Sequence, residues 1–201
     1  KILVPLFSFI LLTACQHDQP KTLFELVENS GINFRNDVVD GQIDNSFYFR
    51  NFYNGGGVAL GDINNDGLPD AVFTSNQGEN KLYINKGGFA FEDISLSAGL
   101  RQDSMWSTGV TMADVNGDGW LDIYVCKSGD LKGKNRSNEL FINNGSSDTS
   151  KISFAEKAKE YGLDSRGLST HAAFFDYDND GDPDLILANG HPDDMVEKYS
   201  S

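Results

Sequence analysis

The sequence predicts an all-β fold of the β-propeller type, built from four-stranded blades and partial in this chain. Three observations lead to this prediction. The apolar runs are only four to five residues long and rich in Val, Ile, Phe and Tyr, which favours strands over helices. Turns containing Gly and Asn separate these runs. A unit of about fifty residues with four such runs recurs along the chain, as in propeller blades.

The strongest repeat is an acidic loop between two apolar runs. Three segments carry it and align residue by residue: 57–74, 109–126 and 171–188. The first aspartates of the first two loops, Asp62 and Asp114, are 52 residues apart, and Asp176 follows 62 residues later. Because each loop lies between two short apolar runs, we expect it to join the first two strands of a blade.

The remainder of the unit also repeats. The run 80–87 matches 138–145, the run 91–100 matches 154–163, and 23–32 is a looser earlier copy. Each unit is therefore expected to supply four strands. We expect about two complete blades plus part of others within residues 23–201, in units at about 23–88, 89–150 and 151–201, the last incomplete.

The N-terminus has the features of a secretory signal: a positive first residue, a short apolar run and small residues before Cys15. Its ending, Leu12-Thr13-Ala14-Cys15, resembles a bacterial lipobox, which implies that Cys15 is acylated and becomes the new N-terminus. The alternative is an ordinary cleaved signal with an incidental cysteine. We expect a signal peptide at 1–15, a tether at 16–22, and a lipoprotein held in the bacterial cell envelope, at the outer membrane or cell surface.

Charge and cysteine content exclude several classes of protein. The net charge is −14, so nucleic acid is not an expected partner, because phosphate binding needs a basic surface. Cys15 and Cys126 are the only cysteines, which rules out a disulfide framework or a cysteine metal site. Cys126 lies in an apolar run and is expected in the core.

The three acidic loops have oxygen donors at alternate positions, which is the pattern that calcium needs, because this cation takes six to eight oxygen ligands. We expect three Ca²⁺ sites, each with side chains from positions one, three, five and nine and the backbone carbonyl of position seven. The expected ligands are Asp62, Asn64, Asp66, Leu68 and Asp70; Asp114, Asn116, Asp118, Trp120 and Asp122; and Asp176, Asp178, Asp180, Asp182 and Asp184. A glycine at position six of each loop suits the sharp turn.

An EF-hand is a different calcium loop and does not fit. It requires a glutamate at position twelve and a helix on each side. Position twelve here is Phe73, Val125 or Leu187, each inside an apolar run. The ninth-position aspartate is therefore expected to close the loop.

These loops and their flanking runs resemble the FG-GAP/VCBS repeat family, whose blades also build the integrin α-subunit propeller. The resemblance covers about 57–188 and implies a nine-residue calcium loop between the first two strands of each blade. The run Asn189-Gly190-His191-Pro192 resembles bacterial lipoprotein relatives of cartilage acidic protein. The Phe-Gly and Gly-Ala-Pro words that name the family are poorly kept, which leaves subfamily, partner and blade number open.

Catalytic motifs are not evident in the sequence. It has no Gly-x-Ser-x-Gly elbow, phosphate loop or dinucleotide fingerprint. The histidines are His17 in the tether, His171 at the start of a run, and His191 in a turn-like segment. We expect a non-enzymatic binding or adhesion module for an unidentified protein or glycan. The alternative is the propeller part of a polysaccharide-acting lyase or hydrolase.

Overall fold

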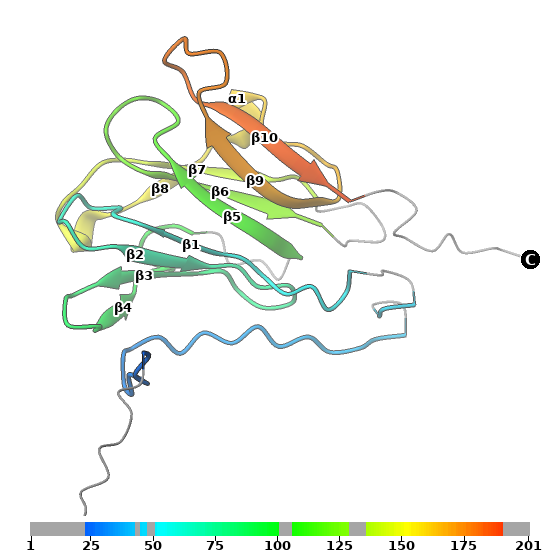
Figure 1. Cartoon of the computed structure of the whole chain (residues 1–201), viewed down its shortest axis with the longest axis horizontal. Coiled ribbons are helices and arrows are strands. Elements are labelled where there is room, and N and C mark those ends of the chain that lie inside the picture. The colour runs from blue at the N-terminus through cyan, green and yellow to red at the C-terminus, as the bar shows by residue number, and fades with distance from the viewer. Residues whose placement is uncertain (1–22, 43–44, 48–50, 101–105, 129–135, 191–201) are drawn as a thin grey trace, which may run out of the picture.

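A computed structural model describes residues 23–42, 45–47, 51–100, 106–128 and 136–190. Two four-stranded antiparallel sheets and one two-stranded hairpin follow each other along the chain (Figure 1). The predicted signal peptide and tether, with Cys15 and His17, lie outside the described residues, and so does His191. No helix within the described ranges is long and apolar enough to cross a membrane.

Both sheets are simple up-and-down meanders in which strands that follow each other in sequence pair with each other. The first sheet contains β1 (Val58–Gly61), β2 (Asp70–Phe73), β3 (Lys81–Asn85) and β4 (Phe91–Asp93). The second contains β5 (Ser107–Ala113), β6 (Asp122–Lys127), β7 (Glu139–Asn143) and β8 (Phe154–Glu156). The 3₁₀ helix η1 (Thr149–Lys151) precedes β8, and the short helix α1 (Ala158–Tyr161) follows it. The hairpin pairs β9 (Ser169–Phe175) with β10 (Asp184–Asn189).

This arrangement confirms the predicted all-β, propeller-type blades: two complete blades and the first two strands of a third. The acidic loops join β1 to β2, β5 to β6 and β9 to β10. The fourth strands β4 and β8 lie beyond residues 88 and 150, so each sheet ends later in the chain than the expected units do.

Two apolar layers hold the blades together. The larger core packs the first two sheets against each other through side chains such as Val72, Ile84, Ile123 and Phe141. A smaller core, which includes Tyr124, Cys126 and Leu140, packs the second sheet against β9 and β10. The first strands of successive blades are neighbours, since β5 contacts both β1 and β9. This places the beginnings of the three blades side by side (Figure 1).

Buried asparagines also connect neighbouring blades. The Asn80 side chain accepts a hydrogen bond from the Ser75 N–H and donates to the Ser107 Oγ of the next blade at 3.1 Å. Asn138 repeats this contact, since its amide donates to the Ser169 Oγ at 2.9 Å. Both asparagines lie just before the third strand and are almost fully buried, so each hydrogen bond fixes the position of one blade relative to the next.

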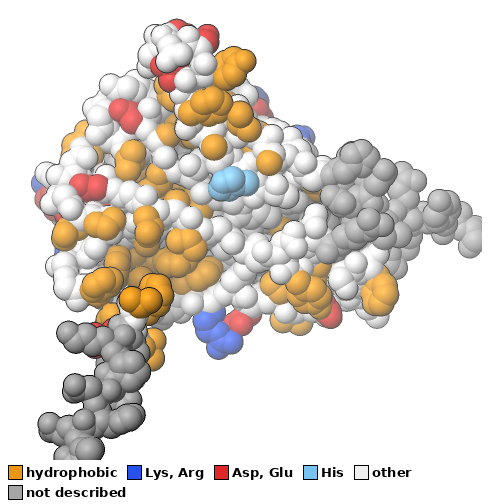
Figure 2. All heavy atoms as spheres, viewed as in Figure 1, with side chains coloured by type: hydrophobic (Ala, Val, Ile, Leu, Met, Phe, Trp, Pro, Cys, Tyr) orange, Lys and Arg blue, Asp and Glu red, His pale blue; other side chains and the backbone are white. Residues whose placement is uncertain are grey.

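Residues 30–39 run beside the first sheet rather than forming a blade of their own. The Ser30 carbonyl accepts from the Phe91 N–H at 2.7 Å, and the Phe34 and Phe73 rings stack with centroids 5.1 Å apart. In the earlier repeat copy, Leu23 and Phe24 are 95% and 90% exposed. The copy therefore does not form a packed strand in this chain. Figure 2 shows further hydrophobic side chains exposed on one face.

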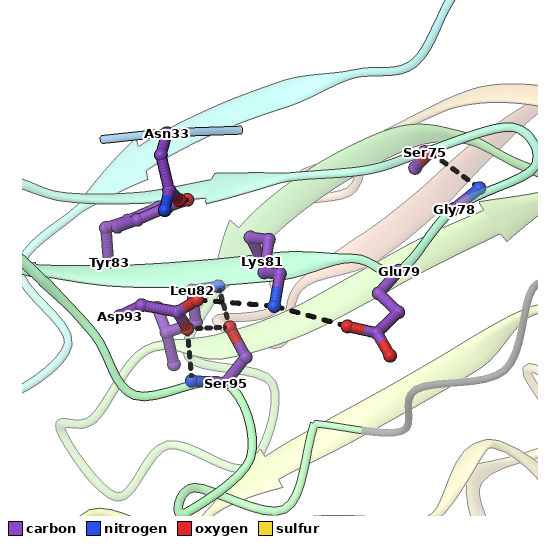
Figure 3. Close-up of polar contacts among 9 residues, drawn as sticks. All are labelled: Asn33, Ser75, Gly78, Glu79, Lys81, Leu82, Tyr83, Asp93 and Ser95. Carbon is purple, nitrogen blue, oxygen red and sulfur yellow. Dashed lines mark hydrogen bonds and ion pairs between the residues drawn. The ribbon is translucent and has the colours of Figure 1, made fainter. Parts of the chain in front are cut away.

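A polar cluster on the outer half of the first sheet fixes the ends of β3 and β4. The Tyr83 hydroxyl donates to the Asn33 Oδ1 at 2.9 Å. Lys81 lies between Glu79 and Asp93, with its Nζ 3.2 Å and 3.3 Å from their carboxylate oxygens (Figure 3). Asp93 in turn accepts hydrogen bonds from Ser95, so the cluster ties three segments together.

Candidate metal sites

The first acidic loop folds around the carboxylates of Asp62 and Asp66. The two oxygens of Asp62 accept hydrogen bonds from the Asp66 N–H at 3.0 Å and the Gly67 N–H at 2.7 Å. The Asp66 Oδ1 accepts from the Leu68 N–H at 2.9 Å. Short side chains at these positions thus satisfy the backbone N–H groups of a tight turn.

The other two loops repeat this geometry. The Asp114 oxygens accept from the N–H groups of Asp118 at 3.0 Å and Gly119 at 2.8 Å. In the third loop the corresponding distances, from the N–H groups of Asp180 and Gly181 to the Asp176 carboxylate, are 3.2 Å and 3.1 Å. Three copies of one hydrogen-bond pattern on three hairpins indicate a single type of site repeated in each blade.

The ninth-position aspartates close the loops. Asp70 accepts from the Ile63 N–H at 2.9 Å and from the Asn85 N–H at 2.8 Å. Asp122 makes the equivalent bonds with the N–H groups of Val115 and Asn143. Each carboxylate therefore joins the start of its own loop to the end of the third strand.

Burial distinguishes the closing aspartates of the first two loops from Asp184, which closes the third loop. Asp70 and Asp122 are 0% and 1% exposed. Asp184 is exposed and accepts from the Tyr177 N–H at 2.8 Å. Within the described residues, no third strand lies beside β10 to donate the second hydrogen bond to Asp184.

Burial also changes the proton affinity of the closing aspartates. Desolvation raises the pKa of Asp70, the hydrogen bonds from Asn85 and Ile63 oppose this, and the charges of Asp66 and Asp62 raise it further. Desolvation likewise raises the pKa of Asp122, against hydrogen bonds from Asn143 and Val115. A cation beside these carboxylates would lower their pKa, because it favours their charged form.

The third loop brings three carboxylates closest together. One oxygen each from Asp176, Asp178 and Asp184 lies within 4.8 Å of the other two. Two oxygens bound to one calcium ion at about 2.3–2.6 Å cannot lie more than about 5 Å apart, so this spacing fits a shared ion. In the part of the chain that the structure describes, no other group of three acidic side chains meets the same spacing.

The first two loops have an amide where the third has Asp178. The Asn64 Nδ2 donates to the Asp66 Oδ2 at 3.0 Å, and the Asn116 Nδ2 donates to the Asp118 Oδ2 at 2.9 Å. The expected side-chain ligands of these loops are thus neighbours, held by hydrogen bonds among themselves. The seventh residues, Leu68, Trp120 and Asp182, follow directly in each turn, and their N–H groups donate to the fifth-position aspartates.

Backbone conformation explains the composition of the turn. Gly67, Gly119 and Gly181 at position six have φ of 86°, 87° and 94°, as the sequence predicts. Position four is also left-handed, with φ of 55° at Asn65, 71° at Gly117 and 61° at Asn179. Position four was not predicted from the sequence. Its signal was present, since Asn and Gly are the residues that adopt this conformation most readily.

The asparagine that ends each third strand was also not predicted from the sequence to contact the acidic loop. Asn85 and Asn143 donate their N–H groups to the closing aspartates and accept, through Oδ1, from the N–H groups of Gly87 and Gly145. Both follow an apolar run of the form Leu-aromatic-Ile. The repeated Asn was visible in the alignment of the units, but its contact with the acidic loop depends on strand pairing.

Comparison with known proteins agrees with the repeat geometry. A family described as FG-GAP-like repeat matches residues 62–125, from the start of the first acidic loop to the strand after the second. The chain is similar to cartilage acidic protein 1 of Xenopus tropicalis, with 29% identity over 171 residues, or 85% of this chain and 25% of that protein. Its identity to integrin alpha-8 of Gallus gallus is 30% over 159 residues, or 67% of this chain and 14% of the integrin.

The match to the human relative is shorter. The chain is 38% identical to cartilage acidic protein 1 of Homo sapiens over 72 residues, or 35% of this chain and 11% of that protein. The chain spans a quarter or less of the length of these relatives. Residues 62–125 are an FG-GAP-like repeat, and the chain is a distant homologue of cartilage acidic protein 1 and of integrin alpha.

Proposed function

We propose that this chain is a calcium-stabilised binding module of the cell envelope, without catalysis of its own. The observation that carries the proposal is the Asp176, Asp178 and Asp184 cluster, whose oxygens lie within 4.8 Å of one another. All the expected metal ligands in the three loops are oxygen atoms, which calcium prefers. A bound ion would supply positive charge among these carboxylates, and the chain's own hydrogen bonds would hold the carboxylates in place.

The role of the ion in this proposal is structural. Each loop connects the first two strands of a blade, and its closing aspartate reaches the third strand in the first two blades. An ion that binds this arrangement and not the unfolded chain stabilises the blade. At a concentration one hundred times its dissociation constant, each site contributes about 2.7 kcal/mol. For a chain of this size that corresponds to about 5–10 °C in melting temperature for each site.

The test is a thermal melt in millimolar calcium against excess chelator. We expect the chelated protein to melt at a markedly lower temperature, and we expect magnesium to be a poor substitute. Asp118→Ala should remove part of the calcium effect. Asp37→Ala is the matched control, because Asp37 forms only an exposed ion pair with Arg35. A midpoint unchanged by chelation would show that the loops are hydrogen-bonded turns without an ion.

The cell-envelope location rests on the sequence Leu12-Thr13-Ala14-Cys15. We expect the native protein in the membrane fraction, with an acylated N-terminal Cys15 and more than one acyl group for stable anchoring. Cys15→Ser should move the protein out of that fraction, whereas Cys126→Ser should not. A native N-terminal peptide with an unmodified Cys15, measured by mass spectrometry, would refute the anchor.

A further inference from the structure

A cavity of about 230 Å³ lies where the beginnings of the three blades meet. Its polar lining comes from the segment before β1, from β5, from the residue after β6 and from β9. The polar lining residues are Asn51, Asn54, Thr108, Ser128, Thr170 and His171. Four glycines complete the wall. The cavity lies at the beginnings of β1, β5 and β9, whereas the acidic loops follow the ends of these strands.

We propose that this cavity, where His171 occupies the position held by glycine in the other two blades, binds a small neutral ligand rich in hydroxyl groups, such as one sugar residue. The inference deepens the proposed binding role by naming a ligand class, and it does not depend on the metal sites.

The His171 position is special because the repeat elsewhere needs glycine there. A Cβ at Gly57 would lie 2.8 Å from the Thr108 carbonyl oxygen, and one at Gly109 would lie 2.6 Å from the Thr170 carbonyl oxygen. At these positions the first strand of the next blade, β5 beside Gly57 and β9 beside Gly109, lies too close for any side chain. His171, at the equivalent position of β9, is exposed. The third blade thus presents an imidazole where the first two present only backbone.

The polar groups of the lining are available to a ligand. Among the described residues, the side chains of Asn51, Asn54 and His171 have no hydrogen-bond partner, and Asn54 and His171 are exposed. An amide both donates and accepts, and a neutral imidazole does the same through its two nitrogens. A sugar hydroxyl also donates and accepts, so it can pair with either group.

The hydroxyls of the lining add acceptors and one further donor. Thr108 donates to the Ser169 carbonyl at 2.6 Å and Thr170 donates to the Ala188 carbonyl at 3.2 Å, which leaves their oxygen lone pairs to accept. The Ser128 hydroxyl is buried and has no partner among the described residues. An unsatisfied buried hydroxyl is unfavourable, and rotation toward the cavity would let it pair with a bound molecule.

The lining also excludes other ligand classes. Among the described residues, the lining contains no Asp, Glu, Lys or Arg, although the chain carries a net charge of −14. A charged ligand would therefore lose its hydration without gaining a counter-charge. An apolar ligand would find no large hydrophobic side chain among the described residues of the wall. The volume is below the roughly 300–1,000 Å³ of pockets for drug-sized molecules, which restricts the ligand to about one ring.

Saturation-transfer NMR tests the proposal on the whole protein in calcium. The probes are methyl glycosides of glucose, galactose, mannose and N-acetylglucosamine, with glucuronic acid and glucosamine as charged counterparts. We expect a neutral glycoside to bind with a dissociation constant on the order of 10⁻³ M, as for other ligands of this size. It should also shift the His171 ring resonances. If no neutral glycoside binds, or if a charged sugar binds more tightly than all of them, the proposal fails.

Variants locate the site. His171→Gly restores the residue that the other blades carry and should weaken binding at least tenfold without lowering the melting temperature. His171→Gln, which keeps a donor and an acceptor, should retain most of the affinity. Binding that persists unchanged in both His171→Gly and Asn54→Ala would place the sugar elsewhere and refute the assignment.

If the corresponding oligosaccharide binds more tightly than the methyl glycoside, the natural ligand is a glycan end. Equal affinities identify a free sugar. In both cases the site is supported, and calcium melts report separately on the metal proposal.

Discussion

The side-chain amide of Asn143 donates a hydrogen bond to the main-chain carbonyl of Ile63 at 3.0 Å, although the two residues are 80 positions apart. Asn143 ends the third strand of the second blade, and Ile63 lies inside the acidic loop of the first. The N–H of Ile63 donates to Asp70, and the N–H of Asn143 donates to Asp122. Ile63 and Asn143 therefore connect the closing aspartates of adjacent loops. A second bond, from the Asn65 amide to the Gly119 carbonyl at 3.0 Å, joins the same loops.

Removing this connection should destabilise the protein and uncouple the two loops. Asn143→Ala leaves the buried carbonyl of Ile63 without its donor, which we expect to lower the free energy of unfolding by about 1–3 kcal/mol. The measurement is chemical denaturation in saturating calcium. Asn144→Ala is the matched control, because the Asn144 amide donates to the Ser153 hydroxyl in an exposed hydrogen bond.

The same contact predicts coupling between the proposed ions. Asp118→Ala, which damages the second loop, should also weaken calcium binding at the first loop. In an Asn143→Ala background that remote effect should shrink, and the double-mutant cycle measures the difference. Strictly additive effects would show that Asn143 supports the fold without linking the sites.

The sequence predicted the blades because the repeat encodes local features. Alternation of short apolar runs with Asn and Gly turns is set by strand pairing within one unit, so β1 to β4 and β5 to β8 followed from it. The contacts between units did not follow. Asn138 and Ser169 are 31 positions apart, and their hydrogen bond exists only because the inner strand of the next blade packs beside β6.

The acidic loops were also predictable in residue type, but not in detail. Their oxygen-bearing side chains and the position-six glycines are local properties of the turn. The burial of Asp70 and Asp122, in contrast with exposed Asp184, depends on the third strand of the same blade. Likewise, nothing in the spacing of Asn54 and His171 indicates a common cavity, because three different blades bring the lining together.

Cys126 should be a sensitive reporter of unfolding. It is fully buried in the core between the second sheet and the hairpin, and this burial raises the pKa of its thiol to about 12. The thiolate is the reactive form, so native Cys126 should resist iodoacetamide at pH 8 and react once the protein is denatured. Peptide mapping by mass spectrometry distinguishes Cys126 from Cys15. Rapid labelling of Cys126 in the native protein would contradict the observed packing.

Asp93 should contribute to stability in a pH-dependent way. Burial alone would raise the pKa of Asp93, but hydrogen bonds from Ser95 and Lys81 outweigh it and hold the pKa below its ordinary value. A group whose pKa is depressed by folding stabilises the native state above its unfolded pKa, and this contribution disappears as the pH falls through the folded pKa. The Asp93 side chain is 35% exposed, so solvent screening limits the effect to about 1 kcal/mol or less.

The check for Asp93 is a pair of urea titrations at several pH values. Asp93→Asn should be less stable than the wild type at pH 7, and the difference should decrease progressively below about pH 5. Asp148→Asn is a useful comparison, because Asp148 also has a lowered pKa but lies in an exposed turn with Lys151. A pH-independent difference for Asp93→Asn would indicate a purely steric effect of the substitution.

The third loop should bind calcium most tightly of the three. Asp178 supplies a charge where the first two loops have Asn64 and Asn116, and it belongs to the carboxylate group whose oxygens lie within 4.8 Å of one another. Additional ligand charge and a smaller rearrangement on binding both favour affinity. We expect dissociation constants on the order of 10⁻⁵–10⁻³ M overall, with the lowest value at the third loop.

Asp178→Asn should raise that value toward the values of the other two loops, while Asn116→Asp should lower the value at the second loop. Calorimetry on single-site proteins measures each constant, with the fifth-position aspartates of the two remaining loops changed to alanine. If the third loop is the weakest, its exposure to solvent, and the missing hydrogen bond to Asp184 among the described residues, outweigh the extra charge.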